Sequence, residues 1–182
     1  MSLHLSFRPL TRETWREFEQ LFGEKGACGG CWCMYWRLNR PNFESGKGAG
    51  NRAAMKRLAS SRNSPGLLAY ADEKPVGWCA VAPREEYVRL ERSRILQRLD
   101  DAPVWSVVCL FVAKPYRGRG VSAALLKAAS EFARERGCRL LEGYPVEPKQ
   151  SRVPDVVAWT GVRSAFKKAG FEEAGRRSLA SR

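Results

Sequence analysis

One strand–turn–helix unit near the middle of the chain constrains the fold more than any other stretch. Residues 104–112 have the sequence VWSVVCLFV, an apolar run rich in β-branched residues that predicts a buried strand. Residues 121–137 place apolar side chains three and four positions apart, which predicts an amphipathic helix ending near Gly137. Because residues 139–144 favour a further strand, the sequence predicts a βαβ unit over residues 104–144.

The turn inside this unit has the sequence Arg117-Gly118-Arg119-Gly120-Val121-Ser122. Its two glycines allow a tight turn and a close approach of the backbone to a ligand. The first amide groups of the following helix have no partner within the helix, and they lie at the positive end of its dipole. With two arginines beside them, these amides predict a binding site for a pyrophosphate.

Apolar periodicity and turn residues predict the elements around this unit. In chain order they are a strand at 5–9, a helix capped by Thr11, a structured loop at 23–46, a basic helix at 51–61, strands at 66–71 and 76–82, an irregular or helical segment at 84–99, a helix at 160–169 and a strand at 171–176. The two strands before the central one are antiparallel, so the order is mixed. We therefore expect one α/β domain over residues 1–182, large enough to bury a core without disulfides.

Composition narrows the class of protein. Lys and Arg number 32 against 19 Asp and Glu, a formal net charge of +13, which favours anionic partners. No segment has the roughly 18 consecutive apolar residues of a membrane span, and the N-terminus lacks the features of a secretory signal. Six cysteines in a chain of this size indicate reduced thiols. We expect a cytoplasmic protein without a membrane partner.

The glycine turn also matches a second kind of nucleotide site. Gly118-x-Gly120-x-x-Ala123 fits the dinucleotide fingerprint, and Glu142 lies at about the right distance for its acidic residue. However, antiparallel strands precede the turn where parallel βαβ units are needed, and too little chain is left for two such halves. Arg117 and Arg119 also make this turn more cationic than the fingerprint. The P-loop pattern is absent.

Two motifs resemble the GNAT superfamily of N-acetyltransferases. The first is similar to the acetyl-CoA signature of the family, and it is Leu110-Phe111-Val112-x-x-Pro115-x-Arg117-Gly118-x-Gly120-Val121, with Ser122 where the family has Gly or Ala. The second is similar to the penultimate helix of the family, which ends in Gly-Phe, and it is Ala165-Phe166-Lys167-Lys168-Ala169-Gly170-Phe171. The strand order agrees, so the resemblance covers nearly the whole chain.

The resemblance implies an enzyme that transfers the acetyl group of acetyl-CoA to a primary amine of a small molecule or peptide by direct attack. It implies a mixed, mostly antiparallel sheet, splayed at the acetyl-CoA site and flanked by helices. The pantetheine arm would lie in the splay, with Phe166 packed against it. The residues expected to hold acetyl-CoA are Leu110, Phe111, Val112, Arg117, Gly118, Arg119, Gly120, Val121, Ser122 and Phe166.

The catalytic residues depart from the family pattern. Phe166 replaces the usual tyrosine of the penultimate helix, and Cys109 lies where the central strand usually has a glutamate. The backbone N–H of Leu110 is expected to stabilise the oxyanion. Tyr144 is then the candidate acid, and Glu142 and Asp155 are candidate bases. Water in place of these side chains is the alternative, as is a purely structural Tyr144.

The segment at 23–46 is rich in cysteine and aromatic residues. Cys28, Cys31 and Cys33 lack a fourth ligand at suitable spacing, so we expect no metal. The resemblance favours a loop that roofs the acceptor pocket, although the same aromatic residues also suit an ordinary core. The candidate acceptor contacts are Trp32, Tyr35, Trp78, Asp155 and Trp159.

Two other functions stay open at the level of sequence. Residues 37–62 hold seven basic residues and one acid, which suits a nucleic-acid-binding module, but no nucleic-acid motif accompanies them. Phe166 leaves open a non-catalytic sensor of acyl-CoA. The sequence decides neither the acceptor nor whether the chain forms a homodimer.

Overall fold

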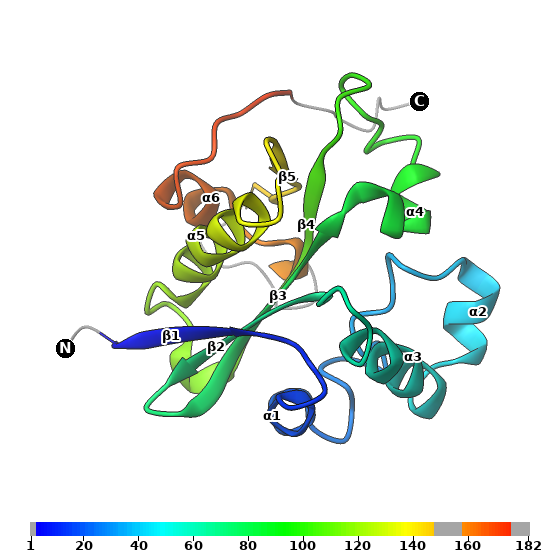
Figure 1. The fold of residues 1–182 in the computed structure, drawn as a ribbon, viewed down its shortest axis with the longest axis vertical. Helices are drawn as coiled ribbons and strands as arrows, with labels where there is room; N and C mark the ends of the chain where they lie inside the picture. Colours follow the sequence, from blue (N-terminus) through cyan, green and yellow to red (C-terminus); the bar gives the residue numbers. More distant parts are fainter. Residues whose placement is uncertain (1–2, 148–157, 176–182) are drawn as a thin grey trace.

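The computed structural model describes residues 3–147 and 158–175 (Figure 1). Its centre is a five-stranded sheet with the order β1-β2-β3-β4-β5. The strands are β1 (Leu5–Pro9), β2 (Gly66–Ala71), β3 (Lys74–Pro83), β4 (Trp105–Val112) and β5 (Leu141–Gly143). The first four pair antiparallel, and β5 pairs with β4 in parallel. The prediction of a mixed, mostly antiparallel sheet is confirmed.

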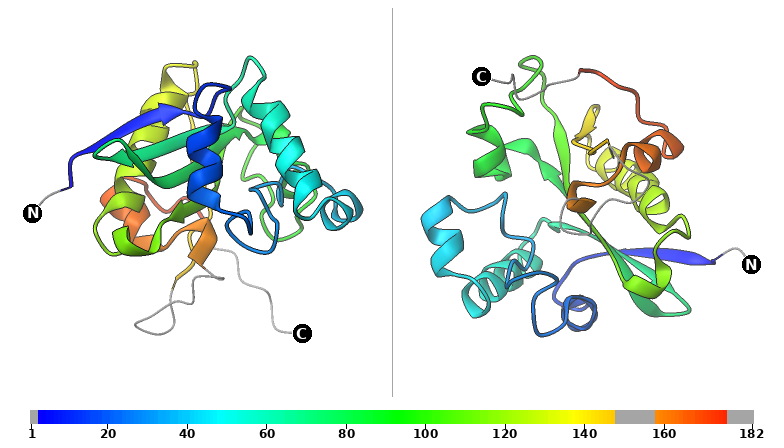
Figure 2. Two further views of the ribbon diagram at one scale, coloured as in Figure 1. Left: turned by 90° about the horizontal axis from the view of Figure 1, so that it is seen from below. Right: turned by 180° about the vertical axis from the view of Figure 1, so that it is seen from behind.

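Helices cover both faces of the sheet (Figure 2). The described helices are α1 (Trp15–Phe22), α2 (Arg40–Ser45), α3 (Ala49–Ala59), α4 (Val88–Glu91), α5 (Val121–Arg134) and α6 (Arg163–Lys168), with short 3-10 helices η1 (Arg84–Glu86), η2 (Lys114–Tyr116) and η3 (Ala158–Thr160). Helices α1, α2 and α3 pack with the core on one face, and α5 and α6 pack with the core on the other. No described helix is long and apolar enough to cross a membrane.

The two cores follow from the alternation of side chains along each strand. Leu68 and Tyr70 of β2 point to the face with α1, whereas Leu67 and Ala69 point to the face with α5. Because both faces are covered, β2 and most of β3 are apolar at nearly every position. On the face with α5, the apolar side of that helix packs against the same strands.

The predicted start of the first helix is wrong. The helix begins at Trp15, with Thr14 and not Thr11 at the N-cap position. The Thr14 hydroxyl donates to the carbonyl of Pro9 at 2.9 Å and accepts from the N–H of Thr11 at 2.9 Å. These bonds stabilise a non-helical bend between β1 and α1. The helix therefore begins about one helical turn later than predicted.

Other differences lie in loops and at the end of the chain. The segment at 23–46 contains α2, which Asn39 caps by accepting from the Asn42 N–H. The predicted last strand is absent from residues 171–175. There the Phe171 ring packs on Phe166 with ring centroids 5.0 Å apart, and Glu173 pairs with Arg163, so this segment lies against α6 and does not extend the sheet.

Candidate active site

The sheet opens between β4 and β5. These strands pair at three positions only, and the last pair is Val107 with Gly143. Among the described residues the next bridge on this side is an isolated one, between Val146 and Val162. The second half of β4, residues 108–112, therefore runs along an opening in the sheet. This opening is the splay that the sequence predicted.

A β-bulge in β4 marks the start of the opening. The register with β3 changes from Ala80–Cys109 to Val81–Val107, which leaves Val108 without a partner in that ladder. The Val108 carbonyl instead accepts a hydrogen bond from Trp36 Nε1 at 3.1 Å. The segment at 23–46 is thus tied to β4 at the point where the sheet opens.

The glycine turn at residues 117–122 follows β4 after the short 3-10 helix η2. Gly118 and Gly120 have φ of 72° and 84°, in the region that favours glycine. Gly120 is the N-cap of α5, and as a glycine it has no side chain to accept hydrogen bonds from the first N–H groups of the helix. A Cβ added at either glycine would meet nothing within 4 Å. The turn therefore leaves open space at a helix N-terminus, the kind of position where anions bind in other proteins.

Arg117 fixes this turn to the strand. Its Nε donates to the carbonyl of Val112 at 2.8 Å. Arg119 is exposed, and Val121 and Ser122 are the first residues of α5. The structure therefore brings together the residues that the sequence assigned to the pyrophosphate.

Phe166 fills the deep end of the opening. It is 3% exposed and comes from α6, which packs on the same face of the sheet as α5. A Cβ at Gly161 would lie 2.7 Å from Phe166 Cε2 and 2.8 Å from Leu110 Cδ1, and a Cβ at Gly143 would overlap the ring. The two glycines thus make room for this ring between the strands. A hydrocarbon ring there can pack against a ligand but cannot transfer a proton.

A network of four polar side chains lies where the β4–β5 pairing ends. Arg84 Nη1 donates to Glu142 Oε1 at 2.7 Å and to the Tyr144 hydroxyl at 2.6 Å. Ser106 Oγ donates to Glu142 Oε1 at 2.8 Å, and the Tyr144 hydroxyl donates to the same carboxylate. Arg84 is 1% exposed and Ser106 is 0% exposed. The structure thus brings Glu142 and Tyr144 together and joins them to two residues that the sequence analysis did not select.

Burial and charge set the protonation of this network. Burial raises the pKa of the Tyr144 phenol, and its hydrogen bond to Glu142 raises that pKa further. Burial acts to lower the pKa of Arg84, but its hydrogen bonds to Glu142 and Glu91 raise that pKa overall. At neutral pH the phenol is therefore neutral and the guanidinium is charged.

Aromatic residues cover the opening on the face with α1. Trp159 of η3 stacks on Trp36 with ring centroids 5.6 Å apart, and Tyr35 meets Trp159 edge-on at 5.1 Å. All three are partly exposed. By contrast, Trp32 and Trp78 are 4% and 0% exposed, and both lie in the core against Phe18 and Phe22 of α1. Asp155 lies outside the described residues.

The three cysteines of the 23–46 segment have different environments. Cys28 is exposed, whereas burial raises the pKa of Cys31 to about 11. Cys33 is buried, and its sulfur accepts a hydrogen bond from Trp78 Nε1 at 3.2 Å. Within the described ranges no group of His, Cys, Asp and Glu is arranged to hold a metal ion. That the protein binds no metal stays a prediction.

Two surface hollows lie away from the opening. One of about 560 Å³ is lined by residues of the 23–46 segment, α3 and η1, and another of about 370 Å³ lies beside Trp105 and Arg136. Neither contains the glycine turn or the second half of β4. The candidate site is thus identified by the end of the β4–β5 pairing and by the residues around it, and not by a hollow of the surface.

Comparison with known proteins identifies the family. The sequence model of the acetyltransferase (GNAT) family matches residues 32–150, which include the bulge, the glycine turn and the Glu142–Tyr144 pair. The chain belongs to the GNAT family. This confirms the prediction of an acyltransferase, with acetyl-CoA, the acyl donor of GNAT enzymes, as its donor.

Individual relatives agree with this membership. The aminoglycoside N(6')-acetyltransferase type 1 of Stenotrophomonas maltophilia is 33% identical over 119 residues, which are 65% of this chain and 66% of that relative. The aminoglycoside N-acetyltransferase AAC(6')-Iy, solved with CoA, has a TM-score of 0.58 at 16% identity over 100% of this chain and 97% of that chain. AAC(6')-Ih from Acinetobacter baumannii has a TM-score of 0.54 at 16% identity, over 98% of each chain. The two solved structures show a shared GNAT fold.

Replacing Arg117 by alanine should weaken acetyl-CoA binding by about 1.5–3 kcal/mol, the value of a charge-assisted hydrogen bond, because the turn loses both a cation and its tie to Val112. Titration calorimetry measures this loss. Arg134→Ala is the matched control, since it removes an equal charge from the other end of α5. Equal affinities for wild type and Arg117→Ala would contradict a pyrophosphate site in this turn.

Proposed function

We propose that this GNAT protein acetylates a primary amine of a small molecule by direct attack of the amine on acetyl-CoA. One observation carries the proposal: the opening along residues 108–112 leads, through the short 3-10 helix η2, to the glycine turn. Acetyl-CoA carries its thioester at the end of a long pantetheine arm, and the pyrophosphate follows that arm. It therefore needs an extended groove that leads to an anion site. The amine then attacks the thioester carbon at the bulge, where the aromatic wall begins.

In this reaction the new C–N bond forms as the C–S bond breaks. The backbone N–H of Leu110 is our candidate for the donor to the oxyanion, because Leu110 lies on the part of β4 that runs along the opening. Fixed backbone donors of this kind cost no reorganisation when charge develops on the carbonyl oxygen. CoA leaves as a thiolate that requires a proton.

Tyr144 and Glu142 are suited to move the protons as one unit. Glu142, whose side chain is 23% exposed, takes a proton from the attacking amine, and Tyr144 gives its proton to the thiolate. The proton on Glu142 then passes along the existing hydrogen bond to the phenolate. This coupling matters because the raised pKa makes Tyr144 a weak acid by itself.

The aromatic wall supports an amine acceptor. Tyr35, Trp36 and Trp159 present partly exposed rings, whose faces attract cations. Because relatives in sequence and fold are aminoglycoside N-acetyltransferases, aminoglycosides are the first acceptors to test. A peptide amine is the second class.

The functional test follows free thiol during incubation with acetyl-CoA and a panel of amines. The panel should include aminoglycosides, polyamines, aromatic amines and peptides with free N-termini. Thiol release that depends on one class identifies the acceptor. If acetyl-CoA raises the melting temperature but no amine of any class releases thiol, the acyl-CoA sensor replaces the enzyme as the better account of Phe166.

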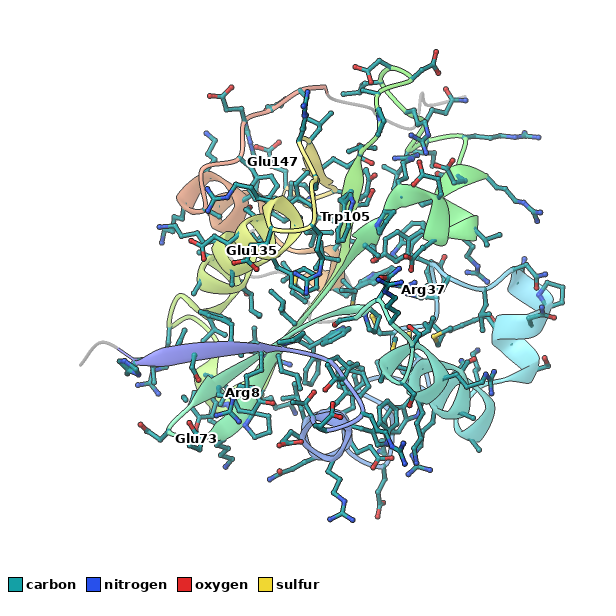
Figure 3. All side chains as sticks on the ribbon, viewed as in Figure 1. Arg8, Arg37, Glu73, Trp105, Glu135 and Glu147 are labelled. Atoms are coloured by element: carbon teal, nitrogen blue, oxygen red, sulfur yellow. The ribbon has the colours of Figure 1, made fainter. Side chains whose placement is uncertain are left out.

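The structure weakens the case for a nucleic-acid-binding module. Several basic residues of the segment at 37–62 have carboxylate partners: Arg37 with Glu86, Lys47 with Glu44 and Arg52 with Glu19. Arg37 is also buried, between the sheet and α3 (Figure 3). Three of the seven basic side chains of this segment are thus paired with carboxylates of the protein itself.

Replacing Tyr35 by leucine should raise KM for the amine about tenfold, which is roughly 1.4 kcal/mol of lost ring contact. KM for acetyl-CoA should change less than twofold, because Tyr35 lies on the acceptor side of the opening. Phe43→Leu is the control, since this buried ring packs beneath Tyr35 at 5.5 Å. If both KM values rise together in Tyr35→Leu, the aromatic wall is not specific to the acceptor.

A further inference from the structure

Arg84 is buried at the hinge of the opening, and we infer that it is a positioning residue that acts through Tyr144 and Glu142 to hold them in their reactive arrangement. The inference rests on the proposed acetyl transfer. Arg84 directly follows β3, and its backbone N–H donates to the Val104 carbonyl at 3.0 Å. Its side chain is 1% exposed, although half of the residues in its segment, 84–99, are charged.

The guanidinium has two sides with different partners. One side faces the region of α4, where Nε donates to Glu91 Oε1 at 2.6 Å and Nη2 donates to the Leu96 carbonyl at 2.6 Å. The other side is Nη1, which donates to both Glu142 and Tyr144. A rigid, planar group with five N–H donors can hold both sets at once, whereas a lysine ammonium cannot.

The contacts of Arg84 link strands of the sheet that do not pair with each other. β3 and β5 are not neighbours, because β4 lies between them. Ala82 pairs with Ser106, and Ser106 pairs with Glu142, so the side chain of Arg84 joins the three strands one pair before the sheet opens. Only three residue pairs hold β5 to β4. Arg84 therefore provides a further tie at the hinge of the opening.

The same contacts orient the proposed proton-transfer pair. Tyr144 accepts from Arg84 and donates to Glu142, which holds the phenol and the carboxylate side by side. Glu142 accepts from Arg84, Ser106 and Tyr144, which holds the carboxylate in place beside the phenol. Without Arg84, the phenol loses its donor and the carboxylate loses its counter-charge.

A double-mutant cycle separates positioning from mere stability. Arg84→Lys is expected to lower kcat about tenfold, measured as thiol release from acetyl-CoA with the fastest amine of the screen, and to change KM for acetyl-CoA less than twofold. The double variant Arg84→Lys/Tyr144→Phe should have a kcat within twofold of that of Tyr144→Phe alone. The reason is that the hydroxyl through which Arg84 acts is already absent. Glu91→Gln is the control on the other side of the guanidinium. It should lower the melting temperature and leave kcat within twofold of wild type.

The inference is overturned if Arg84→Lys lowers kcat by the same factor in both backgrounds. It is also overturned if Arg84→Lys and Glu91→Gln lower the melting temperature equally and neither changes kcat, since Arg84 is then structural only. If Arg84→Lys does not fold, Arg84→Gln, whose amide keeps two N–H donors, replaces it in the cycle and must show the same coupling to Tyr144→Phe. Failure of the proposed function has a different signature, because wild type then releases no thiol with any amine.

Discussion

Replacing Gly120 by valine is expected to abolish measurable binding of acetyl-CoA, with an affinity loss above about 100-fold, or 2.8 kcal/mol. Two effects combine. Gly120 has φ of 84°, where a residue with a Cβ is strained by about 1–2 kcal/mol and a β-branched one by more. The side chain would also enter the open space beside the first amides of α5, where the pyrophosphate is proposed to lie. Titration calorimetry with acetyl-CoA measures the loss.

Gly137→Val is a matched control for this experiment. Gly137 has φ of 80° and an equally open Cβ position, but it lies after the other end of α5. Its substitution should lower the melting temperature by a similar amount and leave the affinity for acetyl-CoA unchanged. If both variants lose affinity together, strain in α5 and not the blocked turn explains the result.

Replacing Tyr144 by phenylalanine is expected to lower kcat by about 100-fold or more, the usual scale for a general acid, with KM for acetyl-CoA nearly constant. The ratio of the two kcat values should not vary between about pH 6 and pH 9. Burial and Glu142 raise the pKa of Tyr144, so the phenol does not ionise in this range. Steady-state thiol release across this pH range provides the measurement.

Tyr70→Phe is the control for the loss of a buried hydroxyl. Tyr70 is 1% exposed on β2, and among the described residues its hydroxyl has no hydrogen-bond partner. This variant should keep wild-type kcat. A loss below about threefold in Tyr144→Phe would assign the proton transfers to water and leave Tyr144 with a structural role.

The central unit of the fold was predictable because its signals are local. The strand that became β4, the turn at 117–122 and the helix that became α5 each follow from consecutive residues. Positive φ at Gly118 and Gly120 agrees with the reason for expecting glycine there. The downstream Gly170, with φ of 90°, likewise ends α6 where the sequence predicted a stop. Family membership could be inferred from these short motifs alone.

Element lengths at the edge of the sheet were less predictable. Residues 139–144 have the composition of a strand, yet only Leu141–Gly143 pair with β4. The bulge at Val108 and the ring of Phe166 separate the strands beyond that point. Whether a β-prone segment pairs depends on its neighbour in space, which sequence periodicity does not reveal.

The sequence by itself determined the glycine turn before α5, the apolar strands and the place of Phe166 on the penultimate helix, since each depends on residue types at short spacing. Only the tertiary structure decided which aromatic residues cover the opening and which fill the core, as the contrast of Trp36 with Trp32 shows. It also placed Arg84 against Glu142, 58 residues further along the chain. Burial and partners over such separations arise from the packing of whole elements, so no local pattern distinguishes a buried, shared guanidinium from an arginine at the surface.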